Sequence, residues 1–236
     1  MTMTWQYVVG RAVARFCFSK LGRMEVTGWE NVPPYGPLIV ASNHLSFTDP
    51  PLLAASIRRP LHFLGKQELF ANPLTSYFLH GFHVSPFNRS GVGLDAVKTL
   101  LKMLAEDKAV VILPEGHRSP DHSLKEGMLG VVYLAMKSQA PILPVGLTGT
   151  EKIRAWRMPV PLRRLNANIG QAFTLPMIEG RVSKEVMKSM LDMIMGRIAL
   201  LLPESYRGVY ADQVTLAGRP GAAGSNRADS TPPAKP

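Results

Sequence analysis

Short apolar runs alternate with segments of helical period along most of this chain, and this alternation limits the folds that it can adopt. The apolar runs predict β-strands at residues 24–28, 38–41, 61–65, 82–85, 109–113, 142–147 and 168–175. The segments between and after them predict helices at residues 49–57, 74–80, 94–106, 128–138 and 184–202. Strands that alternate with helices indicate an α/β domain. We therefore expect a mixed, largely parallel central sheet flanked by helices.

The N-terminal residues 5–21 are rich in aromatic and apolar side chains, and their only charges are basic. On a helical period, one broad face is apolar and consists of Trp5, Val9, Ala12, Val13, Phe16 and Cys17. Arg11 and Arg15 lie one turn apart on the opposite face. We expect an amphipathic helix over residues 1–22 that lies at a membrane interface. A helix packed on the domain core would show the same period, so this alternative stays open.

The length of 236 residues suits one sizeable domain, which we expect to cover residues 23–210. Residues 211–236 are rich in Gly, Ala, Pro and Ser without an apolar period, which predicts a disordered tail. The net charge is +10, from 27 Lys and Arg against 17 Asp and Glu. This excess favours a polyanionic partner, a class that includes nucleic acid, an anionic membrane surface and phosphorylated substrates.

The single cysteine, Cys17, excludes an intramolecular disulfide and favours a reducing compartment. No uninterrupted apolar segment reaches the roughly 18 residues of a predicted transmembrane span. The N-terminal segment, interrupted by Arg11 and Arg15, also lacks the pattern of a secretory signal. The spacing of histidines, cysteines and acids predicts no metal site.

The stretch Asn43-His44-Leu45-Ser46-Phe47-Thr48-Asp49 places an imidazole and a carboxylate between a predicted strand and a predicted helix. In α/β proteins, such strand ends commonly carry binding and catalytic groups. A carboxylate on one ring nitrogen would fix the tautomer of the histidine and leave the other nitrogen as a base. Taken alone, however, the pair is better explained as a helix N-cap before Pro50 and a turn histidine.

Two other polar stretches also follow predicted strands. Pro114-Glu115-Gly116-His117-Arg118-Ser119 follows the strand at 109–113, and Arg89 follows the strand at 82–85. Each stretch has an ordinary explanation, as a turn or as a solvated surface charge. Their common position after strands nevertheless predicts that they meet His44 at one edge of the sheet.

These stretches together resemble the glycerolipid acyltransferases, typified by the lysophosphatidic acid acyltransferases. The His44 stretch is similar to the His-x4-Asp motif of that family, and residues 113–119 resemble its Pro-Glu-Gly-Thr-Arg-Ser signature. Residues 87–89 resemble the block between the two, and residues 140–145 resemble a fourth block, a strand with paired prolines. The four blocks occur in the family's order. His117 stands where the family usually has Thr and Asn88 where Asp often precedes the arginine, which leaves the identity of the acceptor open.

The resemblance implies transfer of a fatty acyl chain from acyl-CoA or acyl-carrier protein to the hydroxyl of a lysophospholipid. The acceptor that fits best is 1-acyl-sn-glycerol-3-phosphate, which would give phosphatidic acid. His44 would be the general base, and Asp49 would orient it. The implied substrate-binding residues are Arg89, Glu115, Gly116, Arg118 and Ser119. The two arginines would hold the acceptor's phosphate, and backbone amides near Gly116 would stabilise an oxyanion.

The resemblance further implies that no cofactor is needed and that the protein contacts an anionic membrane surface. It implies a peripheral or monotopic location at the cytoplasmic face of a membrane. Two alternatives stay open, namely an acyltransferase for an amino-acid lipid or glycolipid acceptor, and a non-catalytic lipid-binding protein of the same fold. Nucleic-acid binding rests on net charge alone, and we do not expect it.

Overall fold

The computed structural model describes residues 4–87, 94–153, 157–158, 160–178, 180 and 182–212. Within them, a seven-stranded sheet has the strand order β1-β7-β6-β2-β5-β3-β4. The strands are β1 (Met24–Thr27), β2 (Leu38–Ser42), β3 (Leu61–Lys66), β4 (Val84–Phe87), β5 (Ala109–Ile112), β6 (Ile142–Thr148) and β7 (Leu165–Ile169). Neighbouring strands are parallel except for the antiparallel pair of β6 and β7. The predicted α/β class with a mixed, largely parallel sheet is confirmed.

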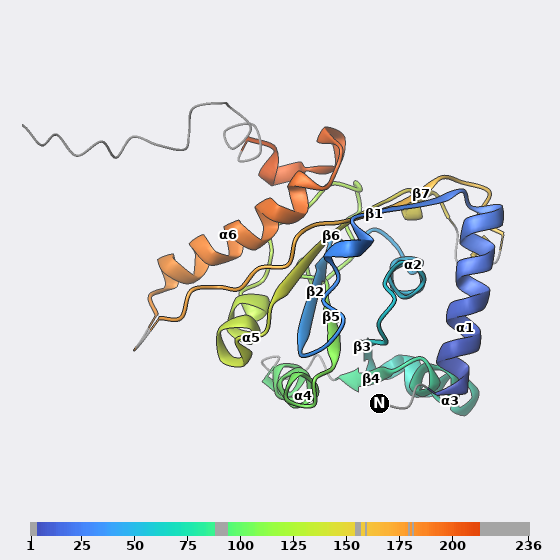
Figure 1. Ribbon diagram of the computed structural model, residues 1–236, viewed down its shortest axis with the longest axis horizontal. Helices are drawn as coiled ribbons and strands as arrows, with labels where there is room; N and C mark the ends of the chain where they lie inside the picture. Colours follow the sequence, from blue (N-terminus) through green and yellow to red (C-terminus); the bar gives the residue numbers. More distant parts are fainter. Residues whose placement is uncertain are drawn as a thin grey trace, which may run out of the picture.

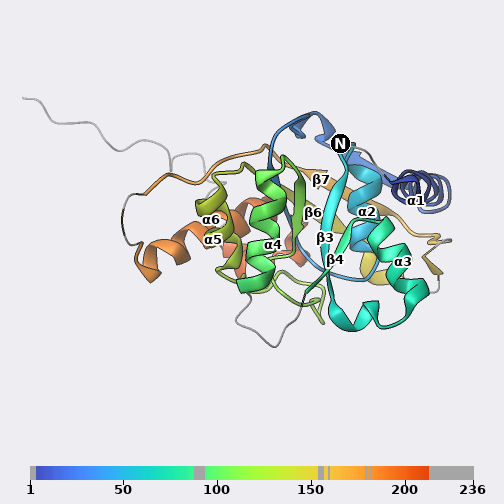
Figure 2. The same ribbon diagram turned by 90° about the horizontal axis from the view of Figure 1, so that it is seen from below.

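Helices flank the sheet on both sides (Figures 1 and 2). On one side lie α1 (Trp5–Phe16), α2 (Asp49–Ser56) and α3 (Pro73–Gly81), and on the other lie α4 (Leu94–Ala105), α5 (Gly130–Ser138) and α6 (Lys184–Leu200). The side chains of the central strand β2 alternate between two apolar clusters. Leu38 and Val40 pack with residues of α2, whereas Ile39 and Ala41 pack with residues of α4, α5 and α6. Because both faces are covered, β2 is apolar until its last residue and completely buried.

The basic face of α1 is directed toward the rest of the protein. Nε of Arg11 donates a hydrogen bond to the carbonyl oxygen of Ala54 at 3.0 Å, and Nη1 of Arg15 donates to that of Ala55 at 3.3 Å. Both carbonyls belong to the last turn of α2, where carbonyl groups lack partners within the helix. The two arginines therefore complete the C-terminal end of α2 and attach α1 to the domain.

The apolar face of α1 points away from the sheet. Trp5 and Phe16 keep 63% and 62% of their surface exposed, whereas Tyr7 and Phe18, on the side of the arginines, are buried. The helix α1 thus packs on the domain through the face that carries the arginines, and not through its apolar face as the alternative of a core-packed helix would require. In the part of the chain that the structure describes, no helix is long and apolar enough to cross a membrane.

Some predicted element boundaries were wrong. The strand predicted at 82–85 begins at Val84, because His83 has a φ of +59°, which a strand does not accommodate. The strand predicted at 168–175 is Leu165–Ile169, where buried apolar residues alternate with asparagines. The N-terminal helical segment, by contrast, reaches Leu21 close to its predicted end, because α1 is followed directly by a π-helical turn, Cys17–Leu21. The predicted disordered tail lies outside the described residues from residue 213 onward.

Candidate active site

Three neighbouring parallel strands end at the same edge of the sheet. β2 ends at Ser42, β5 at Ile112 and β6 at Thr148. The chain after β2 carries His44, and the chain after β5 carries Glu115. The two stretches meet there as the sequence predicts, because the backbone N–H of His44 donates to Oε1 of Glu115 at 2.8 Å.

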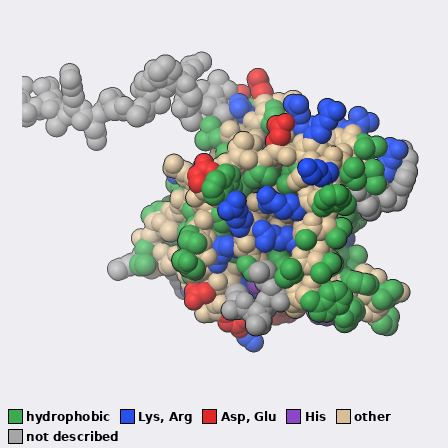
Figure 3. All heavy atoms as spheres, turned by 45° about the vertical axis from the view of Figure 1, so that its right-hand side comes forward, with side chains coloured by type: hydrophobic (Ala, Val, Ile, Leu, Met, Phe, Trp, Pro, Cys, Tyr) green, Lys and Arg blue, Asp and Glu red, His purple; other side chains and the backbone are tan. Residues whose placement is uncertain are grey.

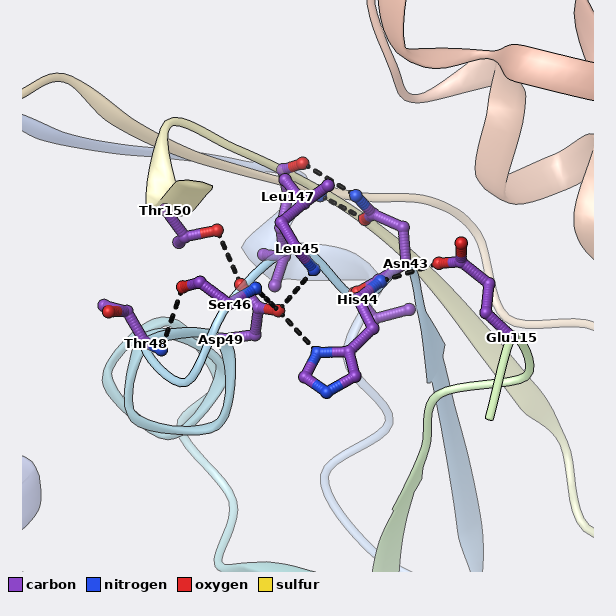
Figure 4. Close-up of polar contacts among 10 residues, drawn as sticks. Asn43, His44, Leu45, Ser46, Thr48, Asp49, Glu115, Leu147 and Thr150 are labelled. Atoms are coloured by element: carbon purple, nitrogen blue, oxygen red, sulfur yellow. Dashed lines mark hydrogen bonds and ion pairs between the residues drawn. The ribbon is translucent and has the colours of Figure 1, made fainter. Parts of the chain in front are cut away.

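The side chains of His44 and Asp49 form a direct pair at this edge (Figure 4). Nδ1 of His44 lies 2.7 Å from Oδ2 of Asp49. The Asp49 side chain is fully buried, and the His44 side chain is 18% exposed. The other ring nitrogen, Nε2, points away from the carboxylate, and within the described residues no hydrogen bond engages it. A histidine with a carboxylate on one nitrogen and an open second nitrogen is suited to act as a general base.

The carboxylate of Asp49 has further donors. Its Oδ2 also accepts hydrogen bonds from the backbone N–H groups of Leu45 at 2.7 Å and Ser46 at 2.8 Å. Its Oδ1 accepts from the hydroxyl of Thr150 at 2.6 Å. The explanation of Asp49 as an N-cap is wrong, since α2 starts at Asp49 and the N-cap position belongs to Thr48. The carboxylate turns back toward the loop that carries His44.

The main chain of His44 is held from both sides by the stretch that follows β5. Its N–H donates to Glu115, and its carbonyl oxygen accepts from the N–H of Ser119 at 2.9 Å. The second oxygen of Glu115 accepts from the N–H of Lys125 at 3.0 Å. Burial raises the pKa of the Glu115 carboxyl group, and the two N–H donors oppose that shift. Glu115 thus bridges the loop that carries His44 and the residues that follow Ser119.

Ser119 and Gly116, both predicted to bind substrate, have partners inside the protein. The Ser119 hydroxyl is buried and donates to the carbonyl oxygen of Ser123 at 2.6 Å. Gly116 has a φ of +71°, and a Cβ added there would lie 2.4 Å from the sulfur of Met128. Its amide donates to the carbonyl oxygen of Leu113 at 3.0 Å. An oxyanion role for this particular amide would require that bond to break.

Arg118 lies at the exposed rim of the site. Its guanidinium carbon is 3.9 Å from the ring centroid of Phe47, which belongs to the stretch between His44 and Asp49. A cation over an aromatic face is attracted by the ring quadrupole, and this contact places the Arg118 charge beside the His44 loop. The other predicted phosphate ligand, Arg89, lies outside the described residues, as does Asn88.

Two polar contacts at the site have no counterpart in the sequence analysis. Asn43 bonds to the backbone of Leu147 twice, donating to its carbonyl oxygen at 3.0 Å and accepting from its N–H at 2.8 Å. These bonds attach the start of the His44 loop to β6. The second contact joins Thr150 to Asp49, which are 101 positions apart. Neither contact produces a local pattern, so neither could be found from spacing.

Among the described residues, no group of three or more His, Cys, Asp or Glu side chains is arranged to hold a metal ion. The ionisable groups that converge at the sheet edge include the imidazole of His44, the carboxyl groups of Asp49 and Glu115, and the guanidinium of Arg118. This set supports proton transfer and anion binding.

Comparison with protein families gives the context for this geometry. Residues 23–148, just over half of the chain, match the family model described as Acyltransferase. The chain belongs to the Acyltransferase family. The matched segment contains the His44–Asp49 pair and the Glu115 stretch.

Individual members of the Acyltransferase family show the same relationship. The 1-acyl-sn-glycerol-3-phosphate acyltransferase of Bacillus subtilis (strain 168) is 32% identical over 144 residues, which cover 57% of this chain and 71% of that protein. The chloroplastic 1-acyl-sn-glycerol-3-phosphate acyltransferase BAT2 of Brassica napus is 30% identical over 134 residues, or 56% of this chain and 39% of its own length. The matched region thus spans about two fifths of the plant protein.

A solved structure shows the same fold. The crystal structure of the 1-acyl-sn-glycerophosphate (LPA) acyltransferase PlsC from Thermotoga maritima superimposes with a TM-score of 0.63 at 21% identity. The superposition covers 91% of this chain and 82% of that chain. The predicted family and the predicted enzyme class, an O-acyltransferase, are confirmed by the family match and the relatives.

Proposed function

We propose that this acyltransferase moves a fatty acyl chain from a thioester to the hydroxyl of 1-acyl-sn-glycerol-3-phosphate, giving phosphatidic acid. The observation that carries the proposal is the pair of His44 and Asp49, with 2.7 Å between Nδ1 and Oδ2 and Nε2 directed away. The printed activities of the Bacillus subtilis and Brassica napus relatives support the choice of acceptor.

In the proposed reaction, Nε2 of His44 removes the proton of the acceptor hydroxyl. The hydroxyl oxygen then forms an ester bond to the thioester carbonyl carbon, and the carbon–sulfur bond breaks. The leaving thiolate takes the proton from Nε2, so that His44 returns to its neutral form. Throughout, the Nδ1 proton of His44 points at Asp49, whose negative charge stabilises the imidazolium that forms.

Arg118 is proposed to bind the acceptor's phosphate. Its guanidinium is exposed and lies against Phe47, three positions beyond His44. A planar guanidinium can form two parallel hydrogen bonds to a phosphate group. Arg89 is proposed as a second phosphate ligand on the basis of the sequence resemblance. The acyl donor, acyl-CoA or acyl-carrier protein, stays a prediction.

An acceptor panel tests this assignment. Purified protein is incubated with acyl-CoA and either 1-acyl-sn-glycerol-3-phosphate, other lysophospholipids or a phosphate-free monoacylglycerol, and products are detected by mass spectrometry. We expect phosphatidic acid as the main product. We also expect Arg118→Leu to raise KM for the phosphate acceptor by roughly tenfold or more, because the variant loses a charge-assisted hydrogen bond to the phosphate.

A matched control for Arg118 is available elsewhere on the surface. Arg58 is also exposed and lies over an aromatic ring, that of Trp29, at 4.6 Å. Arg58→Leu should leave the KM for the acceptor unchanged. A clear preference of the wild-type protein for a phosphate-free acceptor would reject the proposed substrate and favour an amino-acid lipid or glycolipid.

We further propose that α1 docks on an anionic membrane surface by its apolar face. The arginines of α1 are engaged with the end of α2, so the helix presents Trp5, Val13 and Phe16 outward. On the side of the molecule that brings α1 forward, Lys and Arg side chains gather near the middle, and hydrophobic side chains border them (Figure 3). Apolar side chains that enter a bilayer, together with nearby basic charges, favour anionic lipid surfaces.

Vesicle sedimentation tests the membrane proposal. Val13 in α1 is 54% exposed, and Val209, in a separate part of the chain, is 58% exposed. Val13→Asp should lower partitioning onto anionic vesicles by roughly tenfold or more, because a carboxylate is costly in the apolar layer. Val209→Asp should not. Equal binding by both variants would reject a role for α1, and location at the cytoplasmic face stays a prediction.

A further inference from the structure

We propose that Thr150 is a positioning residue whose hydroxyl fixes the carboxylate of Asp49 and, through it, the tautomer of His44. The inference rests on the proposed function, because it concerns the base of that reaction. It adds a third side chain to a pair that the sequence resemblance already suggests. Figure 4 shows the three groups in series, with Thr150 on one oxygen of Asp49 and His44 on the other.

The contact between Thr150 and Asp49 is short and fully buried. The hydroxyl lies 2.6 Å from Oδ1, and both residues have no exposed surface. A buried carboxylate is destabilised unless hydrogen-bond donors surround it. Oδ2 has three donors, whereas among the described residues the Thr150 hydroxyl is the donor to Oδ1. Removal of this hydroxyl therefore leaves a buried anionic oxygen without a partner.

The fold brings Thr150 to this position through a sharp turn after β6. Gly149 has a φ of +90°, a conformation that favours glycine, and a Cβ there would lie 2.1 Å from the carbonyl oxygen of Arg164. Thr150 then begins the short helix Thr150–Lys152. Because β6 is the neighbour of β2, the hydroxyl reaches the loop that follows β2. The turn thus places the Thr150 hydroxyl on Oδ1 of Asp49, whereas His44 contacts Oδ2.

The hydroxyl matters for the proton on His44 because a carboxylate can rotate about its terminal torsion, which has broad minima. With Oδ1 fixed by Thr150, Oδ2 faces Nδ1 of His44 and the two loop amides together. An acceptor held at Nδ1 keeps the imidazole proton there and leaves Nε2 as the base. Without the hydrogen bond from Thr150, the carboxylate of Asp49 can rotate, and the His44 tautomer with its proton on Nε2 becomes populated.

Two substitutions separate a chemical role of Thr150 from simple core packing. Thr150→Val keeps the shape and loses the hydroxyl, whereas Thr150→Ser keeps the hydroxyl and loses a methyl group. Thr148 provides a matched control, because it is buried in the same segment and its hydroxyl accepts from Nδ2 of Asn166 at 2.9 Å instead of contacting Asp49. Thr148→Val tests what the loss of a nearby buried hydroxyl does by itself.

Two measurements on the four proteins decide the proposal. With acyl-CoA and 1-acyl-sn-glycerol-3-phosphate, Thr150→Val should lower kcat by about ten- to a hundredfold with KM unchanged. Thr150→Ser and Thr148→Val should stay within a few-fold of the wild type. In ¹⁵N NMR spectra of the imidazole groups, His44 should carry its proton on Nδ1 in the wild type and in Thr150→Ser, and on both nitrogens in exchange in Thr150→Val.

The NMR measurement also separates failure of this inference from failure of the proposed function. If the wild-type protein turns over no acceptor, the proposed function is wrong, and the His44 tautomers still test the role of Thr150. An unchanged His44 tautomer in Thr150→Val would overturn the inference. Equal losses of kcat in Thr150→Val and Thr150→Ser, or in Thr150→Val and Thr148→Val, would overturn it as well.

Discussion

His44 and His62 lie in the same domain, but different groups surround their imidazole rings. His44 has a carboxylate 2.7 Å from Nδ1, and Nε2 points away from that carboxylate. In the described part of the chain no carboxylate bonds to His62, and its ring stacks on that of His83 with 4.7 Å between centroids. The ring of Tyr7 stacks on the other side of His83 at 4.5 Å. One imidazole is thus paired with a buried carboxylate, and the other is stacked on a second imidazole.

The difference also affects the charge of each histidine. The pKa of His62 is lowered to about 4, chiefly by burial and also by the nearby His83 and Lys108, against the opposite effects of its hydrogen bond to the Ala109 carbonyl and of Glu106. Burial also lowers the pKa of His83. The stacked pair therefore stays neutral near neutral pH. A histidine works as a base when a fixed anion stabilises its protonated form, and among the described residues no anion forms a hydrogen bond with the stacked pair.

The largest effect should follow from removal of the anion that distinguishes His44. Asp49→Asn keeps the size of the side chain, but the amide nitrogen can face Nδ1 and select the tautomer with its proton on Nε2. We expect kcat to fall by roughly a thousandfold, about 4 kcal/mol in the barrier, with little change in KM. Steady-state kinetics of thioester cleavage measures this, and a loss of less than about tenfold would show that Asp49 does not set the tautomer.

A smaller effect should appear in the pH dependence of stability. Between pH 6.5 and about 4, the unfolded chain protonates His62 while the folded protein does not. The unfolding free energy should therefore fall as the pH decreases through this window, by at most about 3 kcal/mol from this residue. His62→Phe keeps a stacked ring without a titrating nitrogen. Denaturant unfolding of this variant should show a shallower decline, while His83 contributes a remaining decline of the same sign.

The same variant, His62→Phe, also tests whether the stacked histidines contribute to activity. At pH 7.5, His62→Phe should retain the kcat of the wild type within about twofold, because the stacked pair makes no contact with the His44–Asp49 pair among the described residues. If the unfolding free energy of His62→Phe decreased with falling pH as steeply as that of the wild type, the assignment of His62 as a neutral buried residue would be contradicted.

The smallest effect concerns Tyr7, which connects α1 to the stacked histidines. Its hydroxyl oxygen accepts a hydrogen bond from the N–H of Leu61 at 2.8 Å. Tyr7→Phe keeps the ring stack but leaves this buried N–H without its acceptor. We expect the unfolding free energy to decrease by about 1–2 kcal/mol without loss of kcat. Denaturant titration measures the change, and an unaltered midpoint would show that the bond contributes nothing to stability.

The elements of the fold could be predicted well from the sequence because each depends on local pattern. The apolar run of β2 and the helical period of α4 can be recognised in the sequence without tertiary information. The boundary of β4 could not be predicted, because it depends on the left-handed conformation of His83. The orientation of α1 was also open, because an amphipathic period does not show which face meets the protein.

The site was predictable in part for the same reason. His44 and Asp49 are five positions apart, and a short motif therefore contains both. Glu115 was predicted at the same edge of the sheet. Its hydrogen bonds with backbone N–H groups were not predicted, because the sequence around a carboxylate in a turn does not indicate which N–H groups will contact it. Thr150 was missed because its contact with Asp49 depends on the pairing of β6 with β2.

The rate of thioester cleavage by His44→Gln tests the general-base role most directly. Wild-type protein and this variant are compared at saturating acyl-CoA and 1-acyl-sn-glycerol-3-phosphate, with free CoA and phosphatidic acid measured together and with unfolding curves to confirm equal folding. Loss of the base should lower kcat by at least about a hundredfold. Turnover by the folded variant at a rate close to that of the wild type would contradict the assignment of His44 as the base.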